Sequence, residues 1–326
     1  MNSKASNQIK LKLSSVNIKG KISFNRSLKK FTWLRVGGDA EIFFQPDCIQ
    51  DLVHLIENIP TETNIFPIGV CSNLLVRDGG IPGVTIRLGR GFSQMQYENG
   101  LICVGAGALD SKVADFAAES GIDLSFLKTI PGTIGGAVKM NAGCYGHSMA
   151  DIIKDATVLS RCGKLRNMSR KDLGLGYRRS KLPDDWIVVA VRLNGQKLST
   201  DEIQKKMQLN QRKRSESQPV GEKTGGSTFK NPYDTSYDVT DIKVKKELRA
   251  WELISESNLR GVKLGGASVS QLHANFLIND GTATADDFEQ LGSFIQRKVY
   301  EQKGVKLEWE IKRVGIKKKM LNKGTK

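Results

Sequence analysis

The sequence predicts an α+β fold with more than one domain, and three observations lead to this prediction. The 326 residues are enough for two or three domains with cores of their own. Strand-like and helix-like patterns follow one another irregularly, which favours α+β over a doubly wound parallel sheet. A polar segment at 194–226 has the composition of a connection between domains, and we expect domain boundaries near residues 90 and 212.

The expected strands are short apolar runs bounded by glycine, proline or aspartate. They are 41–44 (EIFF), 64–69 (NIFPIG), 83–88 (GVTIRL), 101–106 (LICVGA) and 186–193 (WIVVAVRL). A last strand is expected at 306–314, where Leu307, Trp309 and Ile311 alternate with charged residues. This period of two is typical of a strand with one buried face.

Four segments carry apolar residues at helical spacing. They are 48–59, 109–121, 247–261 and 284–304. Gly121, Gly261 and Gly304 close the last three segments and predict where those helices end. Thr284 is the expected N-cap of the final helix.

The net charge of +16 belongs to the two ends of the chain. Residues 1–30 carry eight Lys and Arg and residues 312–326 carry seven, with no acidic residue in either segment. The remaining 35 of the 50 basic residues face 34 acidic ones, so the centre of the chain is nearly neutral. No basic stripe with interleaved aromatic residues occurs there, and we expect no nucleic-acid partner.

Cysteine usage and hydropathy indicate a cytoplasmic protein. The five cysteines are an odd number without Cys-x-x-Cys spacing, which favours reduced thiols over a disulfide framework or a zinc site. The three histidines show no metal-ligand spacing, so no metal is expected. The longest apolar run, Trp186–Val191, is too short for a bilayer, and the first twenty residues lack the apolar part of a signal peptide.

The segment 104–110 (VGAGALD) imitates a dinucleotide-binding fingerprint. Gly105 and Gly107 follow an expected strand and precede an expected helix, but Asp110 occupies the place of the third glycine. That glycine allows close packing of helix on strand, which a charged side chain does not. We therefore expect a tight turn in which Asp110 or Ser111 caps the helix. Neither a P-loop nor a serine nucleophile elbow occurs in the chain.

Two loops have the composition of phosphate-binding backbone. In 67–80 (PIGVCSNLLVRDGG), small residues follow Gly69 and could present successive amides to an anion, although an ordinary turn is the alternative. In 129–146 (TIPGTIGGAVKMNAGCYG), glycines would let the backbone approach a pyrophosphate while Ile and Val anchor the loop. Two such loops, neither of them Rossmann nor P-loop, favour a large dinucleotide such as FAD on a different fold.

Three further motifs carry polar groups suited to chemistry. The segment 224–232 (TGGSTFKNP) presents Ser227 behind two glycines, with Lys230 and Asn231 following; a simple turn is the alternative. The segment 176–180 (GYRRS) places two arginines beside Tyr177, a receptor for phosphate or carboxylate. Glu310 lies on the polar face of the last expected strand, where a solvated side chain is the alternative.

Together these motifs resemble the UDP-N-acetylenolpyruvoylglucosamine reductases, flavoenzymes that complete UDP-N-acetylmuramate in peptidoglycan synthesis. The matching stretches run in family order from about residue 32 to 315, and PGTIGGAVKMNAG and GSTFKNP are the most specific of them. The resemblance implies a vanillyl-alcohol-oxidase-like FAD-binding region of two α+β subdomains, followed by an α+β substrate-binding domain. The expected parts are a basic extension at 1–22, FAD-binding subdomains at 23–90 and 91–212, a substrate-binding domain at 213–314 and a basic tail at 315–326.

The same resemblance implies the reaction. NADPH reduces FAD, and hydride then passes to C3 of the enolpyruvyl group of UDP-N-acetylglucosamine-enolpyruvate, while C2 receives a proton. Ser227 matches the family's proton donor, and Arg178 matches the arginine that supports the developing enolate. Glu310, the second glutamate of LEWE, matches the family's catalytic glutamate near the C-terminus.

The resemblance also implies which residues contact cofactor and substrate. The FAD-binding residues would be Arg35, Gly69, Ser72, Asn73, Leu74, Gly132, Thr133, Gly135, Gly136, Asn141, Ala142, Gly143 and Arg214. The nucleotide-sugar contacts would be Tyr177, Lys230, Asn231 and His273. Val70 and Cys71 stand where the family is richer in glycine, and the extra tyrosine-bearing loop of one branch has no counterpart here. The chain is therefore similar to the shorter-looped branch, and a monomer is expected.

Two other functions remain open at this point. One is another FAD-dependent oxidoreductase of the same fold that acts on a small alcohol, which would not need GSTFKNP together with Glu310. The other is a basic polyanion-binding protein. Such a protein would be colourless, and deletion of its charged ends would abolish polyanion binding.

Overall fold

The computed structural model describes residues 18–232 and 248–318, which form two compact units. The first unit contains Glu41–Val70, Gly83–Glu216 and the described residues up to Asn25. The second unit contains Arg26–Ala40, Cys71–Pro82 and the described residues from Ser217 onward. These units are discontinuous in sequence, whereas the expected domains are continuous segments, and the division near residue 90 stays a prediction.

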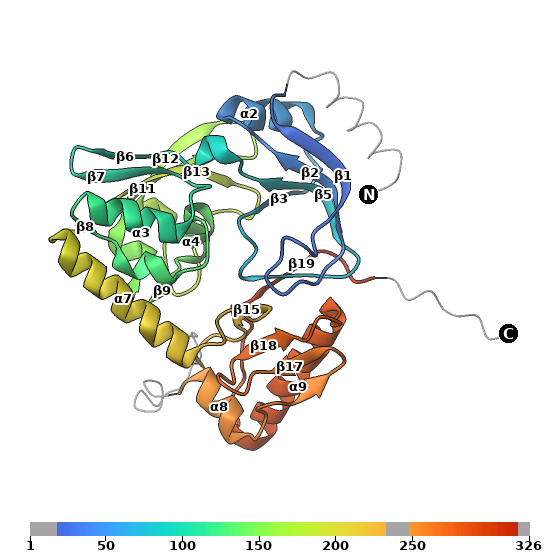
Figure 1. The fold of residues 1–326 in the computed structure, drawn as a ribbon. Helices are drawn as coiled ribbons and strands as arrows, with labels where there is room; N and C mark the ends of the chain where they lie inside the picture. The colour runs from blue at the N-terminus through green and yellow to red at the C-terminus, as the bar shows by residue number, and fades with distance from the viewer. Residues whose placement is uncertain (1–17, 233–247, 319–326) are drawn as a thin grey trace. The chain divides into compact units, whose positions relative to one another are not determined.

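An antiparallel five-stranded sheet forms the larger part of the first unit (Figure 1). In spatial order its strands are β12 (Leu165–Ser169), β11 (Ile153–Leu159), β13 (Ile187–Leu193), β7 (Leu101–Gly105) and β6 (Met95–Glu98). Apolar side chains of this sheet share one core with α3 (Asp110–Glu119), α4 (Ile134–Met140) and α7 (Thr200–Ser217). Val104, Ala114 and Val138 are buried members of this core.

Side chains of a four-stranded sheet contribute to a second hydrophobic core. Its order is β1 (Lys21–Ser27), β2 (Asp39–Gln45), β5 (Ile81–Arg87) and β3 (Ile65–Ile68), and β3 runs parallel to β5. The helix α2 (Ile49–Asn58) buries Leu52, Leu55 and Ile56 against Phe44 and Ile86 of the sheet. The expected strands 41–44, 64–69, 83–88, 101–106 and 186–193 and the expected helices 48–59 and 109–121 are thereby confirmed within a few residues.

Short elements complete the first unit. They are η1 (Arg90–Phe92), β8 (Ile122–Asp123), η2 (Ser125–Thr129), β9 (Gly143–Cys144), β10 (His147–Ser148), α5 (Met149–Ile152), α6 (Arg170–Leu173) and β14 (Gln196–Lys197). β9 pairs with β10 and β14 with β8, both antiparallel.

The second unit has its own sheet and core. The sheet order is β15 (Thr224–Ser227), β18 (Phe276–Asn279), β17 (Ala267–Val269) and β16 (Lys263–Leu264), with antiparallel neighbours. The helices are α8 (Ala250–Glu256) and α9 (Ala285–Lys303). A short parallel pair joins β4 (Leu74–Val76) to β19 (Lys312–Val314). The face of α9 expected from its spacing, with Phe288, Leu291, Ile295 and Val299, lies in the core.

The ends of α9 are as the sequence predicts. The Thr284 hydroxyl accepts a hydrogen bond from Asp287 N–H at 3.1 Å in a capping box, and Gly304 closes the helix at φ +70°. The carboxylate of Asp78 adds to the cap, because it accepts hydrogen bonds from the first two amides of the helix at 3.1 Å. These contacts hold the segment after β4 against the start of α9.

Four segments differ from expectation. The polar connection at 194–226 contains the 18-residue helix α7, which buries only Ile203 and Met207 and so lacks an apolar stripe. The last strand is reduced to Lys312–Val314, preceded by an isolated bridge between Phe229 and Trp309. Helix α8 is shorter than the expected 247–261, whose first residue lies outside the described part of the chain. The glycine-rich stretch 129–146 contains α4.

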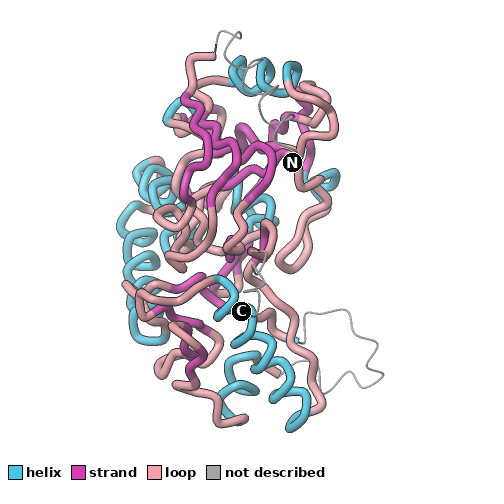
Figure 2. The backbone as a smooth tube through the Cα atoms, turned by 90° about the vertical axis from the view of Figure 1, so that its right-hand side faces the viewer, coloured by secondary structure: helices cyan, strands magenta, loops and turns pink. Residues whose placement is uncertain are grey.

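The prediction of an α+β fold is confirmed, because helices and strands occur in both units (Figure 2). Within residues 18–232 and 248–318, no helix is both long and apolar enough to cross a membrane. The same described residues include no group of three or more His, Cys, Asp or Glu side chains arranged to hold a metal ion.

Candidate active site

The glycine-rich stretch 129–146 is fixed by backbone hydrogen bonds to the segment that follows β7. Ile134 N–H donates to the carbonyl of Ala108 at 3.0 Å, and Gly135 N–H donates to the carbonyl of Ala106 at 2.8 Å. A Cβ atom on Gly135 would lie 3.2 Å from the Cβ of Ala106. The absence of a side chain at Gly135 therefore allows the two backbones to approach closely.

The two expected phosphate loops meet at Gly69 and Thr133. A Cβ atom on Gly69 would lie 2.5 Å from the Oγ1 of Thr133, which is buried and is the N-cap residue of α4. Further along the first loop, Cys71 has φ +56°, the left-handed conformation that glycine adopts most easily. The glycine-poor sequence at Val70 and Cys71 thus keeps a glycine-like backbone turn.

Asn141 joins the glycine-rich stretch to the GYRRS loop. It ends α4 in the left-handed conformation at φ 42°. Its Nδ2 donates to the carbonyl of Gly176 at 3.0 Å, and its Oδ1 accepts from Ala150 N–H at 2.8 Å. The next residue, Ala142, accepts a backbone hydrogen bond from Met149 N–H at 2.9 Å. The expected cofactor residues Asn141 and Ala142 therefore shape the exit from α4.

Arg178 lies beside the same stretch in the first unit. Its Nη2 donates to the carbonyl of Gly143 at 3.2 Å, and its guanidinium carbon lies 5.1 Å from the ring centre of Tyr177. A Cβ atom on Gly143 would lie 2.3 Å from the carbonyl oxygen of His147, so this position also requires glycine. The structure thus brings one expected catalytic residue together with an expected cofactor-binding residue and an expected substrate contact.

Arg214 reaches this region from α7. Its Nη1 donates to the carbonyl of Thr129, and its buried Nε has no hydrogen-bond partner in the described part of the chain. Burial lowers the pKa of the Arg214 guanidinium below its usual value. Arg214 therefore holds the start of the glycine-rich stretch and keeps one donor unused.

In the second unit, Asn275 fixes the strand that carries Ser227. Ser227 is the last residue of β15, follows Gly226 at φ +80° and pairs with Phe276. Two residues later, Phe229 N–H donates to Asn275 Oδ1 at 2.9 Å and the Phe229 carbonyl accepts from Asn275 Nδ2 at 2.8 Å. Asn275 is only 4% exposed, so these two hydrogen bonds are shielded from water.

The backbone pairing brings Ser227 next to the segment of Glu310. Glu310 N–H donates to the Thr228 carbonyl and Lys230 N–H donates to the Glu308 carbonyl, both at 2.8 Å. This antiparallel pattern aligns residues 228–230 with 308–310. Glu310 is paired with Thr228, the residue that follows Ser227, and both Ser227 and Glu310 are half-buried.

The loop 72–74 is attached to the same segment. Asn73 Nδ2 donates to the Glu310 carbonyl at 3.3 Å, and Lys312 N–H donates to the Asn73 carbonyl at 3.1 Å. Leu74, the first residue of β4, pairs with Lys312, and Ser72 is half-buried beside it in sequence. Expected cofactor-binding residues and the expected catalytic Glu310 therefore belong to one connected part of the second unit.

Two expected substrate contacts already have protein partners. Lys230 Nζ forms an ion pair with Glu308 Oε2 at 3.2 Å, and the lysine side chain is 28% exposed. Asn231 Oδ1 accepts a hydrogen bond from Ala250 N–H at 3.1 Å, at the start of α8. Glu308 was not among the expected site residues, and it orients Lys230 rather than Ser227.

His273 is held in a half-buried aromatic setting. Its ring centre lies 4.6 Å from that of Phe276 and 6.1 Å from that of Trp251, and its Nδ1 accepts from Asn275 N–H at 3.3 Å. Burial lowers the pKa of His273 to about 4. The imidazole is therefore neutral at pH 7 and could contact a substrate by hydrogen bonding but not by charge.

Arg35 precedes the β2 strand in an unusual conformation. It has φ +56°, and its Nη1 donates to the carbonyl of Lys30. Two residues earlier, Trp33 N–H donates to the carbonyl of Cys71 at 3.3 Å. The segment of Arg35 and the first expected phosphate loop are thus neighbours within the second unit.

The residues present fit a large dinucleotide cofactor. Five expected cofactor-binding positions are glycines, at 69, 132, 135, 136 and 143. Gly136 is exposed, and the nearest atom to a Cβ placed there would be Thr133 Oγ1 at 3.6 Å. Without a side chain at this position, a ligand can reach the backbone of Gly136 from solvent. Backbone amides can contact a pyrophosphate closely when the loop that carries them has few side chains and is held in place by buried neighbours.

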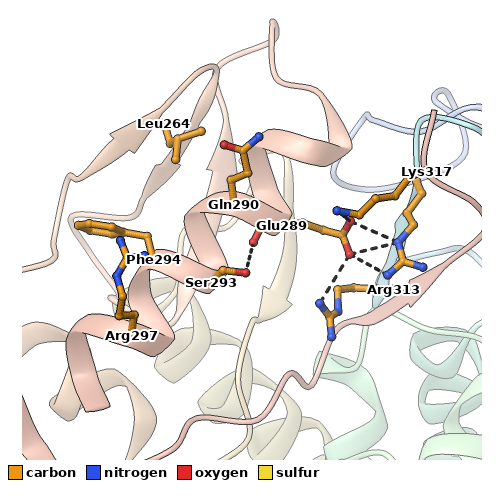
Figure 3. Close-up of a pocket in the computed structure, with 9 residues that line it drawn as sticks. Leu264, Glu289, Gln290, Ser293, Phe294, Arg297, Arg313 and Lys317 are labelled. Atoms are coloured by element: carbon orange, nitrogen blue, oxygen red, sulfur yellow. Dashed lines mark hydrogen bonds and ion pairs between the residues drawn. The ribbon is translucent and has the colours of Figure 1, made fainter. Parts of the chain in front are cut away.

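A separate cavity of about 430 Å³ lies on the second unit along α9 and β19 (Figure 3). Three cations converge there on the buried Glu289: Arg77 at 3.0 Å, Arg313 at 3.6 Å and Lys317 at 3.9 Å. None of the expected site residues lines this cavity. The network fastens β4 and β19 to α9, which identifies it as a structural contact.

Sequence reasoning missed two residues that the structure places at the site. Asn275 has no local signal, because its partner Phe229 is 46 residues away. Asp110 was expected to cap α3, as was Ser111; both expectations are wrong, because the N-cap residue is Leu109 and no side chain caps the helix. The carboxylate of Asp110 lies buried instead.

Family models match both parts of the chain. The model described as "FAD binding domain" matches residues 40–169. The model described as "UDP-N-acetylenolpyruvoylglucosamine reductase, C-terminal domain" matches residues 218–314. The second match covers β15 to β19 and contains both Ser227 and Glu310.

The sequence is similar to proteins of that same family name over nearly their whole length. UDP-N-acetylenolpyruvoylglucosamine reductase from Ruegeria pomeroyi is 47% identical over 91% of this chain and 96% of its own. The protein of that name from Bradyrhizobium is 43% identical over 94% of this chain and 96% of its own. The crystal structure of the reductase from Thermus caldophilus matches with a TM-score of 0.75 and 34% identity, over 91% of this chain and 99% of that one.

Proposed function

The chain belongs to the UDP-N-acetylenolpyruvoylglucosamine reductase family, and from this premise we propose that Ser227, Arg178 and Glu310 carry its chemistry. The protein is an FAD-dependent oxidoreductase that uses NADPH to reduce UDP-N-acetylglucosamine-enolpyruvate in peptidoglycan synthesis. The alternative of a small-alcohol oxidoreductase is not favoured, since the C-terminal family model matches the segment that such an enzyme would not need.

The observation that supports these roles is the pairing of 228–230 with 308–310. It brings the backbone of Glu310 to Thr228, the residue that follows Ser227, and the side-chain amide of Asn275 holds Phe229 beside them. Side chains on paired backbone are placed more accurately than side chains on loops, which suits groups that must meet a reacting atom.

The chemistry supplied by bound FAD is hydride transfer from NADPH to C3 of the enolpyruvyl group. Ser227 then donates a proton to C2, and general acid catalysis of this kind is worth about 10²- to 10⁴-fold. A serine hydroxyl is a weak acid, so its proton must be replaced from a second group. Glu310, one residue of register away, is the group that we propose for this replacement or for orienting the Ser227 hydroxyl.

Arg178 stabilises the negative charge that develops on the substrate carboxyl group during hydride addition. A guanidinium is charged at every relevant pH, and its hydrogen bond to the Gly143 carbonyl fixes its direction before substrate binds. Loss of one such preorganised donor costs roughly 2.7–4 kcal/mol in the transition state. Tyr177, Lys230, Asn231 and His273 are proposed to contact the nucleotide sugar.

FAD is proposed to contact both loops and the residues that brace them. The proposed contacts are Arg35, Gly69, Ser72, Asn73, Leu74, Gly132, Thr133, Gly135, Gly136, Asn141, Ala142, Gly143 and Arg214. The close approach of Gly69 to Thr133, two residues of the first unit, supports a common role for these two positions in phosphate binding. Gly69→Ala should therefore weaken FAD binding by displacing Thr133.

We also propose a cytoplasmic monomer. NADPH and UDP-sugars are cytoplasmic metabolites, so an enzyme that consumes both works where they are made. Light scattering of the FAD-loaded protein should give the mass of one chain, 36.0 kDa. A mass of two chains would contradict the monomer without affecting the proposed reaction.

Replacement of Ser227 tests the assignment of the proton donor. Ser227→Ala should bind FAD and accept hydride from NADPH at the parent rate, while reduction of the enolpyruvyl substrate slows by about 10²- to 10⁴-fold. Single-turnover absorbance measurements separate the two half-reactions. Ser215→Ala on α7, where the exposed hydroxyl donates to the Arg212 carbonyl, is the control and should leave both rates unchanged.

Replacement of Glu310 tests the second role. Glu310→Gln keeps the size of the side chain and its backbone pairing with Thr228. It should slow the same half-reaction as Ser227→Ala, and the double variant should be little slower than Ser227→Ala alone if the two groups act on one proton. Parent rates in Glu310→Gln would remove it from the mechanism.

A further inference from the structure

Asp110 carries a buried carboxyl group that no other described residue binds. It is the first residue of α3 and is 0% exposed. Within residues 18–232 and 248–318, neither of its side-chain oxygens has a hydrogen-bond partner, and both are shielded from solvent. Buried carboxylates in folded proteins are almost always paired or hydrogen-bonded, so this arrangement calls for a physical reason.

The carboxyl group lies against the glycine-rich stretch. Asp110 N–H donates to the carbonyl of Gly132 at 3.2 Å, and the preceding residue, Leu109, forms a bridge with Thr133. A Cβ atom on Gly132 would lie only 2.4 Å from Asp110 Oδ2. The side chain therefore fills the space under Gly132, on the inner side of the loop proposed to hold the diphosphate.

Few charges act on Asp110. Cys144 of β9 is close enough for the two groups to affect each other's ionisation, and Arg178 and Arg214 act on Cys144 in turn. Among the described residues no cation forms an ion pair or hydrogen bond with Asp110. Asp115, on the same helix, differs because Lys128 binds it at 2.6 Å.

The energetic balance decides the protonation state. An ionised carboxylate taken out of water without a partner costs several kcal/mol, whereas the protonated form loses only hydrogen bonds to water. Burial accordingly raises the pKa of Asp110 well above its usual value. A negative charge at this place would in addition repel the diphosphate of FAD through a low-dielectric layer of protein.

We propose that Asp110 is a positioning residue for FAD: it stays a neutral carboxylic acid that supports Gly132 from below and keeps negative charge away from the cofactor's diphosphate. This inference rests on the proposed role of Gly132 and Thr133 in binding FAD. By linkage, FAD and the Asp110 proton favour each other's binding. Cys144 is a titratable group that interacts with Asp110, and Arg178 and Arg214 act on Cys144; all three are shared by the parent and the variants below.

Infrared spectroscopy tests the protonation state directly. The parent protein at pH 7 should show a carboxylic-acid C=O band at higher frequency than the amide band, and Asp110→Asn should lack it. FAD binding should shift this band, because the loop above Asp110 is then occupied. Asp115→Asn is the control on the same helix: its carboxylate pairs with Lys128, so the acid band should survive.

Affinity for FAD tests the positioning role. Asp110→Asn is neutral and nearly the same size, and its Kd for FAD should stay within about threefold of the parent. Asp110→Ala leaves a hole under Gly132, and its Kd should rise about tenfold or more. Thermal unfolding without FAD identifies a variant that has lost its fold, and the shift of the parent's acid band on FAD binding does not depend on the folding of any variant.

The outcomes separate this inference from the proposed function. A protein that binds no FAD would overturn the proposed function. A parent that binds FAD but has no acid band, or whose band FAD leaves unshifted, would overturn the role of Asp110 alone. An Asp110→Asn variant that binds FAD as weakly as Asp110→Ala would also overturn it, because an ionised carboxylate would then be required.

Discussion

Asn275 should be indispensable for the strand that carries Ser227. In Asn275→Ala, the N–H and the carbonyl of Phe229 lose partners at 2.9 and 2.8 Å in a place where the side chain is only 4% exposed. Each buried polar group left unpaired costs about 1–3 kcal/mol, so the free energy of unfolding should fall by about 2–6 kcal/mol. Because Ser227 lies two residues from Phe229, reduction of substrate should slow as well.

Urea unfolding of the FAD-saturated protein, followed by circular dichroism, measures this loss. Asn167→Ala is a suitable control, because Asn167 is exposed on β12 and surface substitutions there should change stability by less than about 0.5 kcal/mol. If Asn275→Ala unfolds within 0.5 kcal/mol of the control, the two hydrogen bonds do not hold the strand, and the argument that backbone pairing places Ser227 is refuted.

Three further predictions concern the second unit. Thr284→Ala removes the hydroxyl cap of α9 and should lower the free energy of unfolding by about 1 kcal/mol in the same assay. Gly292→Ala should also destabilise, by about 1–3 kcal/mol, although alanine is the better helix former, because its Cβ would lie 2.1 Å from the ring of Trp309; a stabilised variant would show that the ring moves freely. His273 has a folded pKa of about 4, lower than its unfolded value, so its contribution to stability is present above pH 6.5 and is lost as the pH falls towards 4. His273→Gln should remove up to one proton from the slope of stability against pH in that window. A slope that is the same in the parent and in His273→Gln would contradict the burial argument.

Segments with strong local signals were predicted well. Helix α9 has an apolar stripe, a capping threonine and a terminal glycine, and all three lie where the sequence predicts. The predicted strands of the first unit, such as β7 and β13, are apolar runs between turn residues, which is sufficient for a buried strand. Local patterns succeed in these places because burial and capping act on neighbouring residues. The strands β1, β6, β11 and β12 were not predicted, and β1, β6 and β12 are largely polar.

Segments whose structure depends on distant contacts were predicted poorly. Helix α7 is polar almost throughout, and its burial comes from two residues that contact the core of the first unit. The segment 306–311 alternates like a strand, but its only bridge is the one between Phe229 and Trp309, among the residues described. In both cases tertiary contacts decide the structure, and a single sequence does not contain them.

The site shows the same division. Gly69 and Gly135 lie in the two loops that the sequence predicts to bind phosphate, and a Cβ atom would lie 2.5 Å from Thr133 Oγ1 at Gly69 and 3.2 Å from Ala106 at Gly135. Asn275 and Asp110 were missed or misassigned because their partners lie far along the chain or are absent. Proximity of Ser227 to Glu310 follows from pairing between segments about 80 residues apart, which no local pattern reveals.

The most direct test of the account is the visible spectrum of the purified protein without oxygen. NADPH should bleach the flavin band in the parent, in Ser215→Ala and in Ser227→Ala. The band should return only when UDP-N-acetylglucosamine-enolpyruvate is added, in the parent and in Ser215→Ala but hardly in Ser227→Ala. A band that bleaches with NADPH and stays bleached in the parent after addition of the enolpyruvyl substrate would contradict the reaction proposed for these residues.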